Sequence, residues 1–166
     1  MRSLSGAFVV AALVIVLGAQ PATAKGPSRE PLIQDPVTFA ADEVCSFRVK
    51  LENVRGGQTQ TSYANGVVRF TGAVWTRVTN LETGRSITIN AGGPITITPN
   101  SDGTVTVKGS GRTLFFFFSG NLGEGRDGAL LLMTGLVVET VNADYTELLS
   151  FEHSSGTTED LCQTLR

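Results

Sequence analysis

The feature that most constrains this chain is an alternation of apolar and polar residues that begins near residue 44. Cys45, Phe47, Val49 and Leu51 alternate with polar residues. A period of two places successive side chains on opposite faces of a strand, so that one face is buried and the other is solvated. The sequence after residue 44 contains no amphipathic helical stretch of useful length. The pattern therefore predicts an all-β fold.

Further strand-like segments follow at short, even intervals, and turns rich in glycine, proline and asparagine separate them. The segments cover residues 67–79, 86–90, 95–98, 104–108, 112–119, 129–133, 136–141 and 145–152. Gly72 predicts a bend or bulge inside the first of them. Strong turn signals lie at 80–84, 99–103 and 142–144. This spacing is typical of a single antiparallel β-barrel or β-sandwich, here of about eight to ten short strands.

The N-terminus has the pattern of a cleavable signal peptide. Arg2 precedes an apolar run over residues 6–19, and Ala22 and Ala24 form the small-x-small pattern that signal peptidase accepts. The apolar run is shorter than the roughly 20 residues that a membrane-spanning helix needs. We therefore predict a signal peptide over 1–24, a secreted, extracellular protein, and no transmembrane segment in the mature chain. Residues 25–43, with three prolines, predict an extended lead-in segment to an all-β domain over 44–166.

The chain has two cysteines, Cys45 and Cys162. Two cysteines in one exported domain are most simply explained by a disulfide bond. The bond would join the start of the first strand to the C-terminus. That arrangement favours closure of the sheet, because closure brings the first and last elements together.

Charge and composition argue against several function classes. The formal net charge is −2, and the 13 lysines and arginines are scattered, so we expect no nucleic-acid partner. His153 is the only histidine, which makes a catalytic triad or a zinc site improbable on composition, and a solvated loop is the expected place for it. We predict no catalytic residue and no cofactor.

Two loop motifs resemble ligand sites only in part. Residues 123–128 (GEGRDG) match a dinucleotide-binding glycine pattern, but a strand-like run follows where a helix is required, so we predict a hairpin loop. Asn100, Asp102, Glu124 and Asp127 offer oxygen ligands without the spacing of a calcium loop. We predict ordinary polar turns and no metal site.

Four consecutive phenylalanines are the most unusual feature of the chain. In a strand, Phe115 and Phe117 would point one way and Phe116 and Phe118 the other. The expected hairpin partner is equally apolar on both faces and contains Leu130, Leu131, Leu132 and Met133. A bare apolar patch of several hundred Å² is unusual for a soluble monomer. The patch would be covered by residues 32–39, by a second copy in a homodimer, or by an apolar small molecule.

Trp75 is a second candidate for surface recognition. Regular alternation would turn it outward between Arg69 and Arg77, where a cation–π contact can form. A bulge at Gly72 would instead shift the phase and bury it.

Six short pieces, taken in order, resemble a group of short secreted actinobacterial β proteins of unknown function. They are residues 45–47 (CSF), 79–86 (TNLETGRS), 92–94 (GGP), 99–104 (PNSDGT), 111–115 (GRTLF) and 155–162 (SGTTEDLC). The likeness spans most of residues 45–165. It implies a signal peptide, a compact β domain and paired N- and C-terminal cysteines, and it implies no activity.

The leading hypothesis from the sequence is a non-enzymatic secreted β-domain that binds an apolar ligand or a surface partner through the phenylalanine patch. One alternative is a secreted hydrolase that uses carboxylates, such as Asp144 and Glu147, at a barrel mouth. Another is a structural protein of the cell envelope without any ligand.

Overall fold

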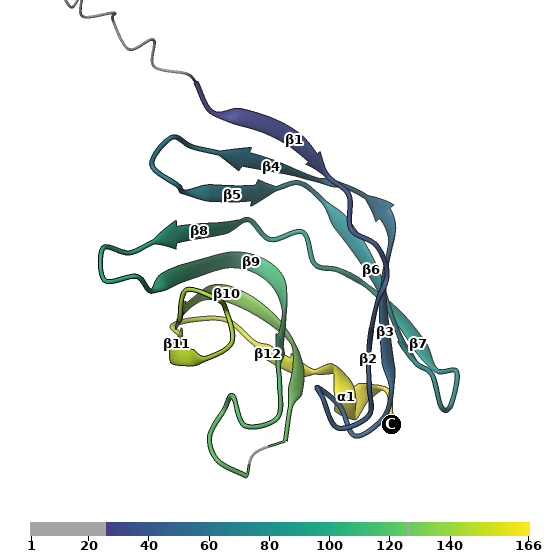
Figure 1. The fold of residues 1–166 in the computed structure, drawn as a ribbon. Coiled ribbons are helices and arrows are strands. Elements are labelled where there is room, and N and C mark those ends of the chain that lie inside the picture. Colours follow the sequence, from purple (N-terminus) through teal and green to yellow (C-terminus); the bar gives the residue numbers. More distant parts are fainter. Residues whose placement is uncertain (1–25, 126) are drawn as a thin grey trace, which may run out of the picture.

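The computed structural model describes residues 26–125 and 127–166, so the predicted signal peptide lies outside the described residues. The described residues form strands joined by turns, with one short helix near the C-terminus (Figure 1). The elements are β1 (Ser28–Leu32), β2 (Val37–Phe39), β3 (Val49–Gly56), β4 (Gln58–Ser62), β5 (Val68–Thr71), β6 (Val74–Asn80), β7 (Ser86–Asn90), β8 (Ile95–Pro99), β9 (Val105–Phe117), β10 (Ala129–Val141), β11 (Leu148–His153), β12 (Thr158–Asp160) and α1 (Leu161–Thr164).

The strands form two antiparallel sheets, which confirms the predicted all-β fold. The larger sheet has the order β1-β4-β5-β8-β9-β10-β11, with β12 also paired to β10. The smaller sheet has the order β2-β3-β6-β7. The expected lead-in segment contributes an edge strand to each sheet: β1 pairs with β4, and β2 pairs with β3.

The two sheets are connected by bent strands. The chain passes from one sheet to the other at Gly57, at residues 72–73 and at residues 91–94. These passages lie against one another, and the Gly57 N–H donates a hydrogen bond to the Ala73 carbonyl at 2.9 Å. The predicted irregularity at Gly72 is confirmed, because the backbone there has φ 133°. It is more than a bulge, since residues 67–79 are divided between β5 of one sheet and β6 of the other.

The predicted segments between 104 and 141 are longer and fewer than expected. Segments 104–108 and 112–119 merge into β9, and segments 129–133 and 136–141 merge into β10, each of 13 residues. Gly111 and Gly135 face each other in the register of this hairpin, with φ values of 72° and 98°. The glycines thus bend the two strands together without ending either one.

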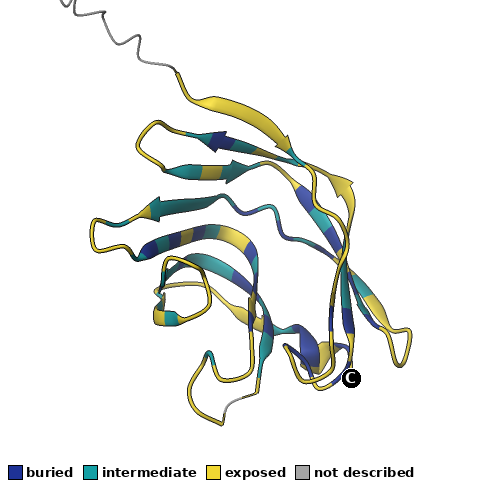
Figure 2. Cartoon of the chain, viewed as in Figure 1, coloured by how far each residue is buried: buried dark blue, intermediate teal, exposed yellow. Residues whose placement is uncertain are grey.

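The main core lies between the smaller sheet, one face of the β9–β10 hairpin and the C-terminal helix. Val49, Val78, Leu130 and Leu161 are fully buried in it. Figure 2 shows the buried positions alternating with exposed ones along β9, as period-two burial requires. The predicted disulfide is present: Cys45 and Cys162 are bonded, with their Cα atoms 5.5 Å apart.

The C-terminus is fastened to this core by a polar contact as well. The Asn80 side chain, 2% exposed, donates a hydrogen bond to the Leu165 carbonyl at 3.1 Å and accepts bonds from the N–H groups of Glu82 and Thr83. Asn80 therefore fixes both the β6–β7 turn and the end of the chain. No helix in the described ranges has the length and apolar character that crossing a bilayer requires.

Candidate functional site

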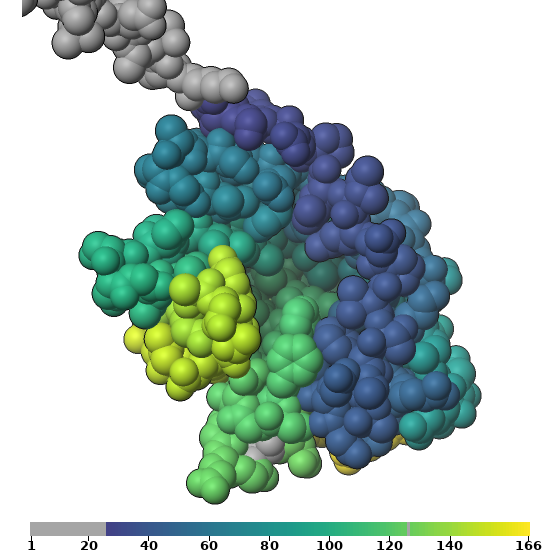
Figure 3. Space-filling model, in the orientation of Figure 1, coloured from purple at the N-terminus to yellow at the C-terminus, as the bar shows by residue number. Residues whose placement is uncertain are grey.

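Two adjoining hollows with largely apolar walls lie in the described part of the chain. The first is lined by strands of the larger sheet and the loops next to them, and the second lies between the larger and the smaller sheet. Their volumes are about 340 Å³ and 430 Å³. Gln34, Gln58, Ile95 and Phe116 line both. Figure 3 shows a recess between the purple and blue N-terminal strands and the yellow-green turn after β10. The volumes fall in the range of roughly 300–1,000 Å³ found for small-molecule sites.

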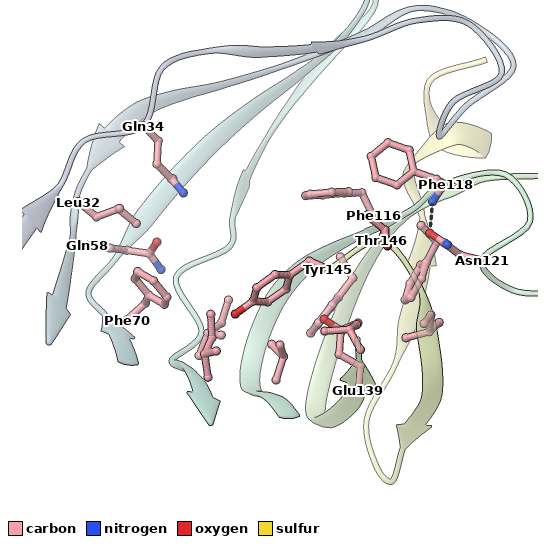
Figure 4. Close-up of a pocket in the computed structure, with 17 residues that line it drawn as sticks. Leu32, Gln34, Gln58, Phe70, Phe116, Phe118, Asn121, Glu139, Tyr145 and Thr146 are labelled. Carbon is pink, nitrogen blue, oxygen red and sulfur yellow. Dashed lines mark hydrogen bonds between the residues drawn. The ribbon is translucent and has the colours of Figure 1, made fainter. Parts of the chain in front are cut away.

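The first hollow has an apolar floor because the long strands direct one face towards it. Val107, Phe115 and Phe117 are alternate residues of β9, and Val141 extends the same face on β10. Figure 4 shows the side chains converging from the N-terminal strands, the sheet floor and the β10–β11 turn. The full lining is Leu32, Gln34, Gln58, Phe70, Ile95, Ile97, Val107, Phe115, Phe116, Phe117, Phe118, Asn121, Glu139, Val141, Tyr145, Thr146 and Leu148.

The second hollow lies over the smaller sheet. Phe39, Leu51 and Val74 contribute from that sheet, and Leu114 and Phe116 contribute from β9. Asp35 is the only charged residue among its described lining residues. The two hollows therefore adjoin each other at the four residues that line both.

The phenylalanine run alternates between two environments, as its sequence predicts. Phe115 and Phe117 are 6% and 3% exposed, whereas Phe116 and Phe118 are 48% and 43% exposed. All four line the first hollow. Phe39 packs against the outer pair, with ring centroids 5.1 Å from Phe116 and 5.9 Å from Phe118. The segment 32–39 thus covers this pair only in part and leaves apolar surface open to the hollow.

The partner run on β10 has a different role from the one expected of it. Leu130 and Leu132 are buried in the main core, and Met133 and Leu131 pack with Phe115 and Phe117 in a second cluster. None of these four β10 residues lines either hollow. Leu130 and Leu132 pack in the main core with residues of the smaller sheet and α1, whereas Leu131 and Met133 lie on the opposite face of β10 with Phe115, Phe117 and Phe151.

Glu139 places a carboxyl group in the first hollow. Its cross-strand partners are Val107 on β9 and Phe151 on β11. Burial raises the pKa of the Glu139 carboxyl above its ordinary value of 4.5. No lysine, arginine or histidine occurs among the described residues that line either hollow. The hollow therefore contains an acidic group without a basic counterpart in its wall.

The first hollow is also lined by uncharged polar side chains, among them Gln34, Asn121 and Tyr145. Gln34 accepts a hydrogen bond from the Asn53 side chain at 2.7 Å, and Asn121 accepts one from the Phe118 N–H at 2.8 Å. Tyr145 lies in the β10–β11 turn with a left-handed φ of 61°. Figure 4 shows its ring extending over the floor of the hollow.

We expect Glu139→Gln to raise the free energy of unfolding at neutral pH and to leave it almost unchanged in acid. Between the ordinary and the raised pKa, the folded protein binds more protons than the unfolded chain, so stability falls as pH rises through that window. Glutamine removes this loss. The measurement is urea unfolding of both proteins at about pH 3 and pH 7. Tyr145 is the only other titratable residue among the described lining of this hollow.

Two other carboxyl groups have lowered pKa values, so their contribution to stability changes with pH in the opposite direction to that of Glu139. Hydrogen bonds from Thr104 and Thr146 lower the pKa values of Asp102 and Asp144 respectively, and stability from them is lost as the pH falls through those lowered values. Both are present in the two proteins compared, so they cancel in the difference. An equal effect of Glu139→Gln at both pH values would contradict burial of the charge.

Trp75 faces away from both hollows. Its neighbours Val74 and Thr76 are buried, and Trp75 is only partly buried on the opposite face of β6. The Arg55 guanidinium lies 4.5 Å from the centre of its ring. The outward orientation and the cation–π contact agree with one of the two alternatives from the sequence, but the partner is Arg55 on β3 instead of Arg69 or Arg77.

The other candidate residues are separate from the hollows. His153 lies in β11, where its Nε2 is 2.8 Å from the Thr134 carbonyl, so it is held in the sheet instead of a free loop. Asp144 and Glu147 are exposed in the turn after β10, and neither lines a hollow. Asp102 caps its own turn by accepting from the Thr104 N–H at 3.0 Å.

The loop that carries the glycine pattern joins β9 to β10 as a hairpin connection, apart from Arg126, which lies outside the described residues. Over 26–125 and 127–166, no group of three or more histidine, cysteine, aspartate or glutamate residues is arranged to hold a metal ion.

Comparison with known proteins returns no match of any of the three kinds sought: no protein-family model, no curated protein and no solved structure matches this chain. The fold and the hollows are therefore the basis for a function.

Proposed function

We propose that this protein is a non-enzymatic carrier or receptor that binds a small apolar molecule in these hollows. The observation that carries the proposal is the pair of adjoining hollows, about 340 Å³ and 430 Å³, floored by aliphatic side chains and the phenylalanine run. Exposing Phe116 and Phe118 to water loses roughly 25 cal/mol for each Å² of apolar surface. A ligand that covers these rings recovers that free energy.

The proposal includes export to an oxidising compartment. A disulfide between Cys45 and Cys162 is typical of secreted domains. In this account residues 1–24 are removed, and the two sheets act as a sandwich that is splayed open on the side of the hollows. The intact mass of the protein recovered from culture medium tests export: it should correspond to a chain that starts at Lys25 and lacks two hydrogens.

Extraction of the folded protein tests ligand binding directly. Protein purified without detergent is denatured in organic solvent, and the extract is analysed by mass spectrometry. We expect a small apolar compound in an amount close to that of the protein. A clean extract from a monomer that also binds no hydrophobic dye would contradict the proposal. If the protein is instead a dimer that binds no dye, a second copy covers the patch, as the sequence allows.

We expect Ile95→Trp to weaken binding of a hydrophobic dye about tenfold or more, because Ile95 lines both hollows and a larger ring would occupy the space that joins them. Fluorescence titration measures the affinity. Leu149→Trp is the matched control: Leu149 is 48% exposed on β11 and lines neither hollow, so the same residue added there should leave the affinity unchanged. Equal affinities for all three proteins would place the dye elsewhere.

The hydrolase alternative has less to support it. Each hollow has a single carboxylate among its described lining residues, Glu139 in one and Asp35 in the other. Glycoside hydrolysis requires two carboxyl groups on opposite sides of one bond. The structural envelope role predicts no ligand, so the extraction experiment separates it from binding.

A further inference from the structure

We propose that the ligand carries a positive charge: an apolar molecule with a protonated amine that pairs with Glu139. This inference rests on the proposed function and names the chemical class of the ligand. It follows from where β10 places the carboxyl group, from what surrounds it, and from which charges are missing in the wall of the hollow.

The position of Glu139 is fixed by the register of three strands. In β10 it stands opposite Val107 of β9 and Phe151 of β11. Val107, Val141 and Leu148 form an apolar cluster at this end of the first hollow. An outward carboxyl group would be solvated freely, but this one points into the hollow among aliphatic side chains (Figure 4). A charge in such a place is costly unless a partner compensates for it.

The described residues supply no such partner. No basic side chain lines either hollow, and Glu139 takes part in neither of the two ion pairs within the described ranges. The nearest cation along β9 is Lys108, which is exposed and pairs with Val138, on the face of the sheet opposite to Val107 and Glu139. A cationic ligand would supply the countercharge that these residues do not.

The same reasoning excludes the commonest apolar anions. A fatty acid would bring a second negative charge beside Glu139 without any basic group to receive it, and like charges at short range repel strongly in a poorly solvated site. An ammonium group reverses the sign of this interaction. A hydrogen bond between oppositely charged groups is roughly twice as strong as a neutral one. The apolar part of the ligand would then lie along Phe115, Phe117 and Ile97.

Three probes with the same chain and different head groups test the charge. Decylamine, decanol and decanoate, each below its micelle concentration, compete at neutral pH with a hydrophobic dye bound to the full protein. We expect decylamine to bind about tenfold or more tightly than decanol, since hydrogen bonds to charged groups contribute roughly 1.5–3 kcal/mol. Decanoate should bind most weakly. Decanoate binding as tightly as decylamine would overturn the inference.

Two variants then assign the preference to Glu139. Glu139→Gln should abolish the tighter binding of decylamine and leave decanol unchanged. Glu152→Gln is the matched control, because Glu152 is exposed on β11 and pairs with Val138 on the opposite face of the same sheet. It removes the same charge from the protein without touching the hollow, so the preference should persist.

The outcomes separate this inference from the function on which it rests. If decanol binds and decylamine binds no better, or if Glu139→Gln retains the amine preference, the charge assignment is wrong and the apolar site stands. If Glu152→Gln loses as much preference as Glu139→Gln, the effect comes from net charge and the assignment is again wrong. If none of the three probes displaces the dye, the proposed function fails and this inference fails with it.

Discussion

Gly92→Ala should lower the free energy of unfolding by about 2–3 kcal/mol, although it adds only one methyl group. A Cβ atom at Gly92 would lie 2.7 Å from the Gly72 carbonyl oxygen and 2.8 Å from both the Ala73 Cα and the Val74 nitrogen. These are backbone atoms of the neighbouring passage between the sheets, so they cannot move aside as a flexible side chain would. Urea unfolding followed by Trp75 fluorescence gives the difference, and Trp75 is the only tryptophan in the chain.

Gly57→Ala is the matched control for this effect. Gly57 also lies at a passage between the sheets, but no heavy atom comes within 4 Å of the position that its Cβ would take. Its backbone is outside the left-handed region, so alanine should be neutral or should stabilise the protein by about 0.4–1 kcal/mol through the unfolded state. Equal effects of the two substitutions would mean that the passages between the sheets are not closely packed.

Removal of the disulfide has the largest effect that we expect on stability, a loss of about 4 kcal/mol from the double variant Cys45→Ala/Cys162→Ala. The bond closes a loop with a sequence separation of 117 residues. Chain-entropy arguments give roughly 4.7 kcal/mol for a loop of about 100 residues, and measured losses are typically about 2–5 kcal/mol. Total stability is only about 5–15 kcal/mol for a domain, so such a loss brings the fold close to its limit.

The C-terminal segment explains why we expect so large a loss of stability. Leu161 and Leu165 are 0% and 1% exposed in the core beside Val44 and Phe47. The four-residue helix α1 contains Leu161 and is followed directly by Leu165, and it has little stability of its own, because isolated helices of this length do not form in water. Cys162 ties that helix to Cys45 at the start of the first core segment. Without the bond, the C-terminal residues can leave the core more easily.

Reductant provides the control for the cysteine variant. Dithiothreitol should shift the urea midpoint of the original protein to that of the double variant and should leave the double variant itself unchanged. A midpoint for the original protein that does not move after its disulfide is shown by mass to be reduced would contradict the expected loss.

Local periodicity determined the class of the fold. The alternation of Cys45, Phe47, Val49 and Leu51 predicted a half-buried strand from residue 44. The structure begins that strand, β3, only at Val49, although Cys45 and Phe47 are buried as predicted. The turn residues at 80–84 and 99–103 placed two hairpins correctly, because turn signals depend only on neighbouring residues. The two cysteines predicted the disulfide for an equally simple reason: each was the only partner that the other had. The alternation of Phe115–Phe118 between a buried and an exposed environment was also predicted, because it depends only on the period of a strand.

Local sequence patterns did not predict how the chain continues at its glycines. A glycine in a strand pattern is compatible with a turn, a bulge, a bend or a change of sheet, and only the contacts of neighbouring strands decide among these. Gly111 and Gly135 bend a continuous hairpin, whereas Gly57 and Gly72 carry the chain from one sheet to the other. The sequence therefore divided β9 and β10 into too many strands and joined β5 to β6.

The candidate site depended on these bends. Glu139 gave no signal in the sequence, since a single acidic residue in a strand is usually solvated, and its place opposite Val107 and Phe151 follows from the register of three strands. By itself the sequence determined which residues are apolar, which alternate and which two form the covalent link, because these are properties of the chain and its neighbours. Tertiary structure alone decided that the curved larger sheet and the adjoining smaller sheet leave apolar hollows and that the Glu139 carboxyl group faces into the first of them, since both depend on residues that are far apart in the chain.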